Sequence, residues 1–254
     1  MRVSPKKENW LDYSSKLNFS YIPRILYILF TRPKPAIKKA LYIIFEKRAF
    51  DKLNKTVAKS SLKLITAEND RLGTRTGQYD DIWNLYSITK ERSPSVVWEY
   101  GPGWTTVGLV AGIIDSGSDG IVYAIEADKD WFKWYKEAFS KLDDEIKSRI
   151  KLVYSPTEIT DDYDERSVRH TILPEKMPDL VHIDGCSNSE DVDIVCDIVD
   201  LEDQLPNICT VILDGRVNNL RFLQRNLKRE TSLKKRLLQN ELMQPVLTIQ
   251  NKIK

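Results

Sequence analysis

The sequence predicts an α/β protein whose mostly parallel, doubly wound sheet carries helices on both faces. Apolar, β-branched runs of strand length alternate with amphipathic runs of helix length from residue 95 onward. Four of the apolar runs finish at an acidic residue, and no internal repeat interrupts the pattern. Strands that alternate with helices are joined by right-handed crossovers, and this makes the sheet parallel.

The first half of the sheet is expected to contain two strand–helix units. Residues 95–100 are rich in the β-branched and aromatic side chains that favour strands, and residues 105–114 follow as a helix. The Asp-, Ser- and Gly-rich residues 115–120 predict a turn. A second strand is expected at residues 121–126, with its helix at residues 130–142.

The second half continues with a strand at residues 150–154 and a polar, acidic loop at residues 157–169. A fourth strand is expected at residues 179–184, a helix at about residues 189–201, and a fifth strand at residues 208–214. The remaining elements are a helix and two strands that would close the sheet as an antiparallel pair, at residues 218–228, 232–238 and 246–251.

Residues 1–63 are expected to form a basic, helical N-terminal extension, and residues 64–254 the main domain. Apolar side chains recur at three-to-four spacing in residues 36–64, with lysines and arginines on the other face. Such a helix could cover the core, or it could lie at a homodimer interface. Through residues 21–63 it could instead make peripheral contact with a membrane surface.

The composition is that of a globular protein with a large core, because 41% of the 254 residues are hydrophobic and 30% are charged. The polar start lacks the apolar stretch of a secretory signal. Three cysteines without a Cys-x-x-Cys pair indicate free thiols in a reducing compartment. We therefore expect a cytoplasmic protein, with membrane association through the extension as the alternative.

The net charge of +2 conceals a strong charge asymmetry. Residues 1–63 carry +11, residues 64–216 carry −16 and residues 217–254 carry +7. The interpretation that we favour is that the basic ends pack against the acidic middle. The alternative is attraction of the ends to an anionic surface, either a membrane or a nucleic acid.

Polar side chains gather at four strand ends, which a parallel sheet brings to one edge. They belong to Glu99, Glu126, Asp184 and Asp214. One such carboxylate could simply cap the next helix, but four together indicate a ligand site. Ligands of open α/β sheets bind beyond the carboxyl ends of the strands.

The Gly101-Pro102-Gly103 turn narrows the choice of ligand. A glycine has no Cβ, so the backbone can turn sharply and approach a ligand closely. Thr106 stands where the dinucleotide fingerprint has its third glycine. Glu99 would repel a pyrophosphate but would suit an ammonium group, which favours S-adenosylmethionine over a nicotinamide cofactor.

Residues 95–215 resemble the class I S-adenosylmethionine-dependent methyltransferases, which have a Rossmann-like fold. Glu99-x-Gly101-x-Gly103 is similar to the first motif of that family, and Glu126 to the acidic residue that binds the ribose hydroxyls. Asp184 matches the fourth motif, near the transferred methyl group. The resemblance implies the following cofactor-binding residues: Glu99, Gly101, Gly103, Thr106, Glu126, Ala127, Ser155, Thr157 and Asp184.

Residues 104–106 and 183–185 look most like the small-molecule O-methyltransferase branch, which implies methylation of a small molecule or glycan hydroxyl. The candidate catalytic residues are Asp184 as the base, Asp214, and Arg216 for an anionic group of the substrate. Relatives in this branch often hold a divalent metal, but the chain has Asp214-Gly215 where they have Asp-Asn. We therefore do not favour a metal.

Three other functions remain as alternatives. A ribose-directed nucleic-acid methyltransferase could use the basic extension to grip its substrate, although nucleic acid is the less favoured partner. An NAD-dependent oxidoreductase is disfavoured by Glu99 and Thr106. A cofactor-binding module without turnover would share the sequence pattern, and only an assay separates it from an enzyme.

Overall fold

The computed structural model describes residues 48–49, 51–52, 55, 79–186, 192–234, 237–238, 241–242 and 244–251. The chain divides into two compact units, Met1–Trp83 and Asn84–Lys254, and helix α4 (Tyr79–Arg92) crosses the boundary. The expected helix at residues 36–64 lies almost entirely outside the described residues. The extension and its boundary at residue 63 therefore stay predictions.

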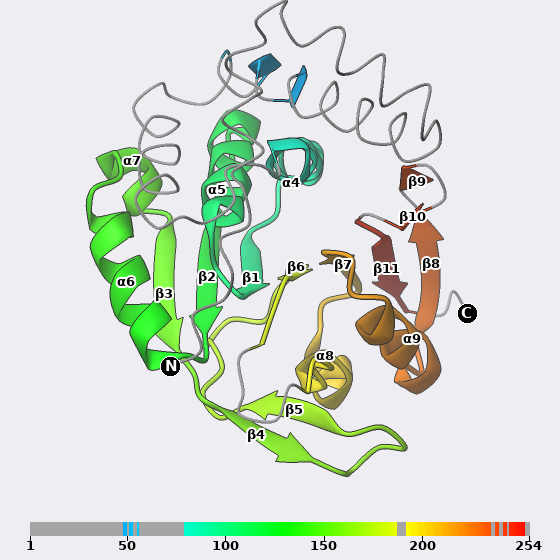
Figure 1. Cartoon of the computed structure of the whole chain (residues 1–254). Coiled ribbons are helices and arrows are strands. Elements are labelled where there is room, and N and C mark those ends of the chain that lie inside the picture. The colour runs from blue at the N-terminus through cyan, green and yellow to red at the C-terminus, as the bar shows by residue number, and fades with distance from the viewer. Residues whose placement is uncertain are drawn as a thin grey trace, which may run out of the picture. The chain divides into compact units, whose positions relative to one another are not determined.

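The described residues of the second unit form a seven-stranded sheet, shown in Figure 1. The strands in spatial order are β3 (Ile150–Tyr154), β2 (Ile121–Glu126), β1 (Val96–Tyr100), β6 (Leu180–Ile183), β7 (Ile208–Leu213), β11 (Val246–Gln250) and β8 (Glu230–Lys234). The first five are parallel, and β11 runs antiparallel to both of its neighbours. The predicted parallel sheet and its antiparallel closing pair are confirmed.

Helices cover both faces of the sheet. On one face, α5 (Trp104–Ser116) buries nine consecutive residues and α6 (Lys129–Ser140) packs beside it, followed by the short α7 (Asp144–Lys147). On the other face, α8 (Asp197–Asp200) and α9 (Val217–Asn226) join the core cluster that contains Trp98, Tyr100 and Val181. A 3-10 turn, η2 (Glu202–Gln204), follows α8. This is the doubly wound arrangement that the sequence predicts.

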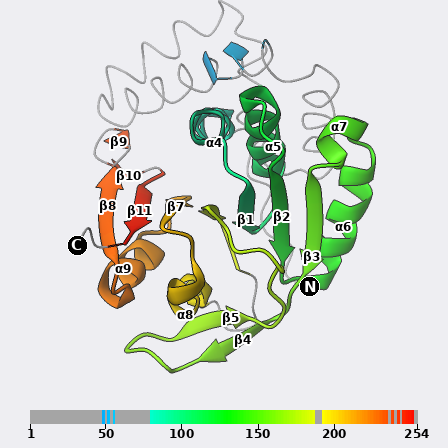
Figure 2. The ribbon, with the colours of Figure 1, turned by 180° about the vertical axis from the view of Figure 1, so that it is seen from behind.

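The prediction of a loop at residues 157–169 is wrong. Strands β4 (Thr157–Thr160) and β5 (Ser167–His170) form an antiparallel hairpin in which Thr157 pairs with His170. The sequence looks polar because six of these eight strand residues are polar or charged, although Ser167 and His170 are buried together with Val168. Val168 on the inner face is fully buried. In both Figure 1 and Figure 2 the hairpin lies beside α8.

The prediction of a helix at residues 189–201 is right only for α8, because residues 192–196 are not helical. Residues 187–191 lie outside the described part of the chain. Val195 instead forms a parallel bridge with Val168, supported by hydrogen bonds from Val168 N to Ile194 O (2.7 Å) and from Cys196 N to Val168 O (3.0 Å). Pairing with the hairpin therefore overrides the helical spacing of the apolar residues.

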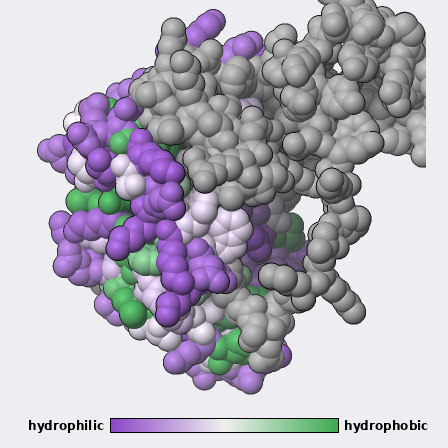
Figure 3. Space-filling model, turned by 60° about the vertical axis from the view of Figure 1, so that its left-hand side comes forward, coloured by the Kyte–Doolittle hydropathy of each residue, from purple (hydrophilic) through white to green (hydrophobic). Residues whose placement is uncertain are grey.

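The remaining elements agree with expectation or are small. Beyond β8, residues Leu237–Leu238 (β9) and Glu241–Leu242 (β10) form a short antiparallel pair. None of the helices among the described residues has the length and apolar character needed to cross a membrane. On the face shown in Figure 3, hydrophilic side chains predominate and hydrophobic ones are scattered.

The three cysteines are free. Cys196 and Cys209 are buried, and Cys186 is partly buried. Burial raises the pKa of Cys186 to about 11 and the pKa of both Cys196 and Cys209 to about 12. All three thiols are therefore protonated near neutral pH, and none has the character of a nucleophile.

Candidate active site

The end of β1 and the start of α5 form a tight turn around two glycines with different constraints. Gly101 has φ +78°, and a Cβ there would lie 2.9 Å from the main-chain nitrogen of Gly185. The fold itself therefore requires this glycine. A Cβ on Gly103 would meet only Thr105 Oγ1, at 3.7 Å. Packing does not require a glycine at position 103, and its missing side chain leaves the space at the N-terminus of α5 open.

Glu99 is fully buried beneath this turn and is surrounded by donors. Its Oε1 accepts a hydrogen bond from Thr105 Oγ1 at 2.6 Å, and its Oε2 accepts one from the Thr106 hydroxyl. Thr106 Oγ1 in turn accepts from the main-chain nitrogen of Gly103 at 3.1 Å. The carboxylate therefore ties the end of β1 to the first turn of α5.

His182, on the neighbouring strand β6, completes this buried cluster. Its Nδ1 lies 3.2 Å from Glu99 Oε1, and its Nε2 is buried without a partner among the described residues. Burial alone would lower the pKa of His182, but the hydrogen bond to Glu99 and nearby carboxylate charges raise it overall. His182 is therefore a core histidine whose partner is a predicted site residue.

The end of β2 presents Glu126, which is 6% exposed. Its Oε1 accepts from the main-chain nitrogen of Asp128 at 2.7 Å, and Asp128 caps α6 through the nitrogens of Asp130 and Trp131, both at 2.8 Å. Burial raises the pKa of Glu126. Ala127 lies between the two acids and is half-buried.

Beyond β3, the segment Ser155–Thr157 lies directly against Glu126. The main-chain nitrogen of Ser155 donates to Glu126 O at 2.9 Å, and the buried Ser155 Oγ accepts from Ile172 N at 3.0 Å. Thr157 is the first residue of β4. The structure therefore brings the predicted ribose and adenine residues together at one end of the sheet edge.

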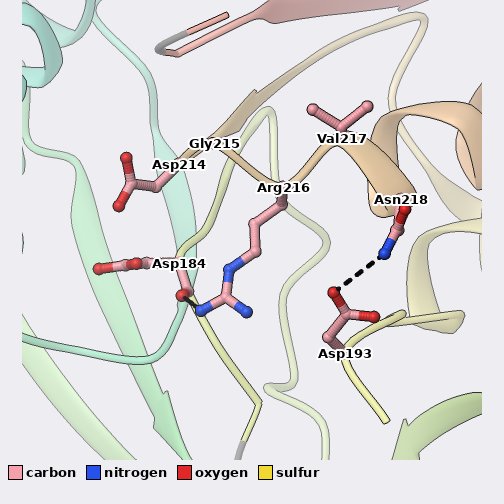
Figure 4. Close-up of a pocket in the computed structure, with 7 residues that line it drawn as sticks. All are labelled: Asp184, Asp193, Asp214, Gly215, Arg216, Val217 and Asn218. Carbon is pink, nitrogen blue, oxygen red and sulfur yellow. Dashed lines mark hydrogen bonds between the residues drawn. The ribbon is translucent and has the colours of Figure 1, made fainter. Parts of the chain in front are cut away.

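At the other end, the ends of β6 and β7 open into a pocket of about 420 Å³, shown in Figure 4. The residues that line it are Asp184, Asp193, Asp214, Gly215, Arg216, Val217 and Asn218. The Arg216 guanidinium donates to the main-chain oxygen of Asp184. Asn218 Nδ2 donates to Asp193 Oδ2 at 3.4 Å. The three predicted catalytic residues therefore share one cavity.

Asp184 has the most strongly altered acidity in this pocket. Burial is the main cause that raises the pKa of Asp184 to about 7; the charge of His182 opposes this rise, and a hydrogen bond and charge from Asp214 reinforce it. Burial and the neighbouring Asp214 therefore favour the protonated form of Asp184. Among the residues that the structure describes, no group of three or more His, Cys, Asp or Glu side chains is arranged to hold a metal.

Several residues of this edge were not singled out as site residues from the sequence. Asp193 lies in a loop and Asn218 in the first turn of α9, and neither carries a local sequence signal. Tyr135 of α6 is another: burial raises its pKa, and the charges of Glu126, Glu99 and Asp184 raise it further. His170, just past the segment predicted as a loop, is 3% exposed at the end of β5.

The sheet order, the glycine turn and the acidic strand ends define the class I methyltransferase fold. Comparison with solved structures shows the same fold. The chain is similar to a putative caffeoyl-CoA O-methyltransferase from Staphylococcus aureus, with a TM-score of 0.53 and 11% identity over 84% of this chain and 99% of the other.

Two further structures have the same architecture. An O-methyltransferase from Bacillus cereus in complex with SAH aligns with a TM-score of 0.51 and 9% identity, covering 79% of this chain and 96% of that one. Cofactor-bound Rv0187 from MTB aligns with a TM-score of 0.52 and 15% identity, covering 79% and 95%. No protein-family model and no curated protein matches the sequence. At these identities the likeness establishes the fold.

Proposed function

We propose that the protein is an S-adenosylmethionine-dependent methyltransferase that acts on a hydroxyl group of a polar small molecule or glycan. The observation that carries the proposal is the continuous sheet edge that joins the open glycine turn to the pocket with Asp184. The fold shared with structures of O-methyltransferases, one of them in complex with SAH, supports the same interpretation.

The residues along the edge fit the cofactor in chemistry. The buried carboxylate of Glu126 suits ribose hydroxyls, and the segment Ser155–Thr157 beside it suits the adenine. The open space at Gly103, at the N-terminus of α5, leaves room for the amino-acid part. When bound, the cofactor supplies an electrophilic methyl group on a positively charged sulfur.

We propose an indirect role for Glu99. Its two oxygens offer about four acceptor sites, and three are taken by Thr105, Thr106 and His182. The carboxylate therefore acts chiefly by fixing the glycine turn, with one acceptor site left for an ammonium group. Thr106 contributes in the same way, through Gly103 N.

Asp184 is the proposed general base. A pKa of about 7 keeps a useful fraction of the carboxyl group ionised at neutral pH while leaving it basic enough to take a hydroxyl proton. The neighbouring carboxyl group of Asp214 helps to raise the pKa of Asp184. Arg216 is anchored on the Asp184 main chain and holds the end of β6 in place. Its remaining N–H groups can orient the acceptor.

The pocket favours a hydroxyl-rich acceptor. Apart from Val217 and Gly215, the residues that line it are charged or amide-bearing, and three of them are aspartates. Carboxylates accept hydrogen bonds from hydroxyl groups, whereas an aromatic acceptor would need apolar walls. A phosphate-rich acceptor would meet repulsion from the aspartates, which argues against a nucleic acid.

Calorimetry with SAH and with NAD tests the cofactor assignment. We expect saturable binding of SAH by the wild-type protein and weaker binding by Glu126→Ala. The matched control is Glu137→Ala on the exposed side of α6, which should bind normally. Binding of NAD alone would overturn the proposal.

The acceptor class is tested by measuring SAH release from S-adenosylmethionine with monosaccharides and polyols in one set and catechols in another. Turnover with the first set is expected. Turnover with catechols alone would contradict the assignment of a polar acceptor. Cofactor binding without turnover on either set would support the non-catalytic module instead.

A further inference from the structure

A buried histidine–aspartate pair lies beside the proposed cofactor site and has no part in the function described above. His170 is 3% exposed and Asp197 is 1% exposed. His170 Nδ1 lies 2.6 Å from Asp197 Oδ2, and the main-chain nitrogen of His170 donates to Asp197 Oδ1 at 3.0 Å. Both oxygens of the carboxylate are therefore committed to one residue, and the imidazole is held in a single orientation.

The pair is a costly way to fill a core. Burying ionisable groups requires desolvation, and well-packed apolar side chains of similar volume are often as stable or more stable. Tyr100, which is also fully buried, packs its ring on His170 with 4.7 Å between ring centroids. Three buried polar side chains thus meet at one point, and this concentration suggests a role beyond packing.

The hairpin connects this point to the segment after β3. His170 pairs with Thr157 in the hairpin, and Thr171 and Ile172 then form hydrogen bonds to the same segment. Thr171 donates to Pro156 O from its main-chain nitrogen at 2.9 Å and from its hydroxyl at 3.0 Å, and Ile172 N donates to Ser155 Oγ. The position of the proposed adenine segment therefore depends on the end of β5.

Two further contacts extend the influence of His170 along the edge. Tyr100 directly precedes the glycine turn, and its main-chain oxygen accepts from the nitrogens of Asp184 (3.0 Å) and Gly185 (3.1 Å). The segment held by the end of β5 also reaches the proposed ribose acid, since Ser155 N donates to Glu126 O at 2.9 Å. One imidazole is thus linked to the proposed adenine segment, the ribose acid and the glycine turn.

We propose that His170, oriented by Asp197, is a positioning residue for the nucleoside half of the cofactor. It holds Ser155–Thr157 and Glu126 at the spacing that an adenosine group requires. The inference rests on the proposed function, and it assigns a specific task to the hairpin.

Two variants of His170 and a matched control separate positioning from packing. His170→Phe keeps an aromatic ring against Tyr100 but removes both nitrogens, whereas His170→Asn keeps a donor near Asp197 but removes the ring. Arg169→Gln is the control, since Arg169 lies in the same hairpin with its side chain 41% exposed and paired with Asp162 and Asp200.

The probes are SAH and 5′-methylthioadenosine, measured by calorimetry, together with the KM for S-adenosylmethionine and kcat. His170→Phe should lower the affinity for both adenosine-containing probes about tenfold, equivalent to about 1.4 kcal/mol. KM should rise with kcat at saturation changed less than twofold. His170→Asn should lose less affinity than His170→Phe, and Arg169→Gln should bind both probes normally.

Unchanged affinity in a folded His170→Phe protein would overturn the inference. If that variant fails to fold, the two single variants Asp197→Asn and His170→Asn are measured in its place. Normal binding of the probes by both of these variants would overturn the inference equally. A wild-type protein that binds neither probe would instead refute the proposed function. The two failures are therefore distinguishable.

Discussion

Two acidic clusters lie next to each other at the same edge of the sheet, and they differ in how their charges are satisfied. Around Glu99, two threonine hydroxyls and His182 occupy most of the acceptor sites of a fully buried carboxylate. Around Asp184 and Asp214, the carboxyl groups share a hydrogen bond with each other and face an open pocket.

The difference separates two tasks that a carboxylate can perform. A carboxylate whose lone pairs are already used holds backbone segments in place and exchanges no proton with a substrate. A carboxyl group with a pKa near neutrality and an open side can take one. The sheet edge thus combines a rigid cofactor end with a reactive acceptor end. His182 of the first cluster and Asp184 of the second are only two residues apart, on β6 and just beyond its end.

The largest expected effect comes from removing the reactive carboxylate. Asp184→Asn should lower kcat about 10²- to 10⁴-fold, the usual contribution of a positioned general base. The affinity for SAH, measured by calorimetry, should change much less than kcat. An equal loss of both would mean that Asp184 serves the cofactor and not the chemistry, and the contrast between the two clusters would disappear.

Breaking the closed cluster should affect stability more than chemistry. Glu99→Gln leaves His182 buried without its anionic partner, so we expect the free energy of unfolding to fall by about 3 kcal/mol. Urea denaturation measures this loss. Glu145→Gln in the exposed α7 replaces the same residue type at the surface and should change stability by less than about 0.5 kcal/mol.

The glycine turn between the clusters offers a matched pair of substitutions. Gly101→Ala and Gly117→Ala both place a side chain at positive φ, +78° and +74°, which costs about 1–2 kcal/mol. A Cβ at Gly117 meets nothing within 4 Å, whereas one at Gly101 meets Gly185 N. Gly101→Ala should therefore be the more destabilising variant, by about 1 kcal/mol, and should also weaken SAH binding. Equal stabilities would show that the strand ends can move apart freely.

The smallest expected effect concerns pH. Asp184 acts as a base only after it loses its proton, so kcat should rise as pH passes about 7. Asp214 raises the pKa of Asp184, so Asp214→Asn should lower it and move the rise toward lower pH. At pH 6 the variant should keep a fraction of its plateau kcat that is up to about tenfold larger than the fraction that the wild type keeps. An unshifted pH profile of kcat would show that Asp214 does not control the acidity of the base.

Much of the central sheet could be predicted from local pattern. The strands at residues 121–126 and 150–154 were predicted with the bounds that the structure shows, because each is an apolar run bordered by turn residues or charges. The candidate site followed from the same logic, since residues just beyond parallel strands must meet at one edge. Their individual roles stay predictions.

The failures share a physical cause. Each of β4 and β5 has four residues and only one apolar side chain, Ile159 and Val168, which is too little apolar signal to distinguish the strands from a polar loop. The apolar side chains of residues 192–199 fit either the repeat of a helix or that of a strand. The bridge from Val168 to Val195 determines which conformation the residues around Val195 adopt. The burial of His170 carries no local signal either, since its partner Asp197 is 27 residues away.

The position of β11 has a consequence for how the sheet assembles. The strand that comes last among the described residues lies between β7 and β8 and supplies the hydrogen-bonded partner of both. Until it arrives, β7 has a bare edge whose Val211 and Leu213 belong to the core. The pairing of β11 with β7 joins residues far apart in the sequence, a kind of contact that forms slowly, and an apolar edge left exposed until then favours aggregation. A chaperone that shields β7 would raise the yield of folded protein without taking part in its function.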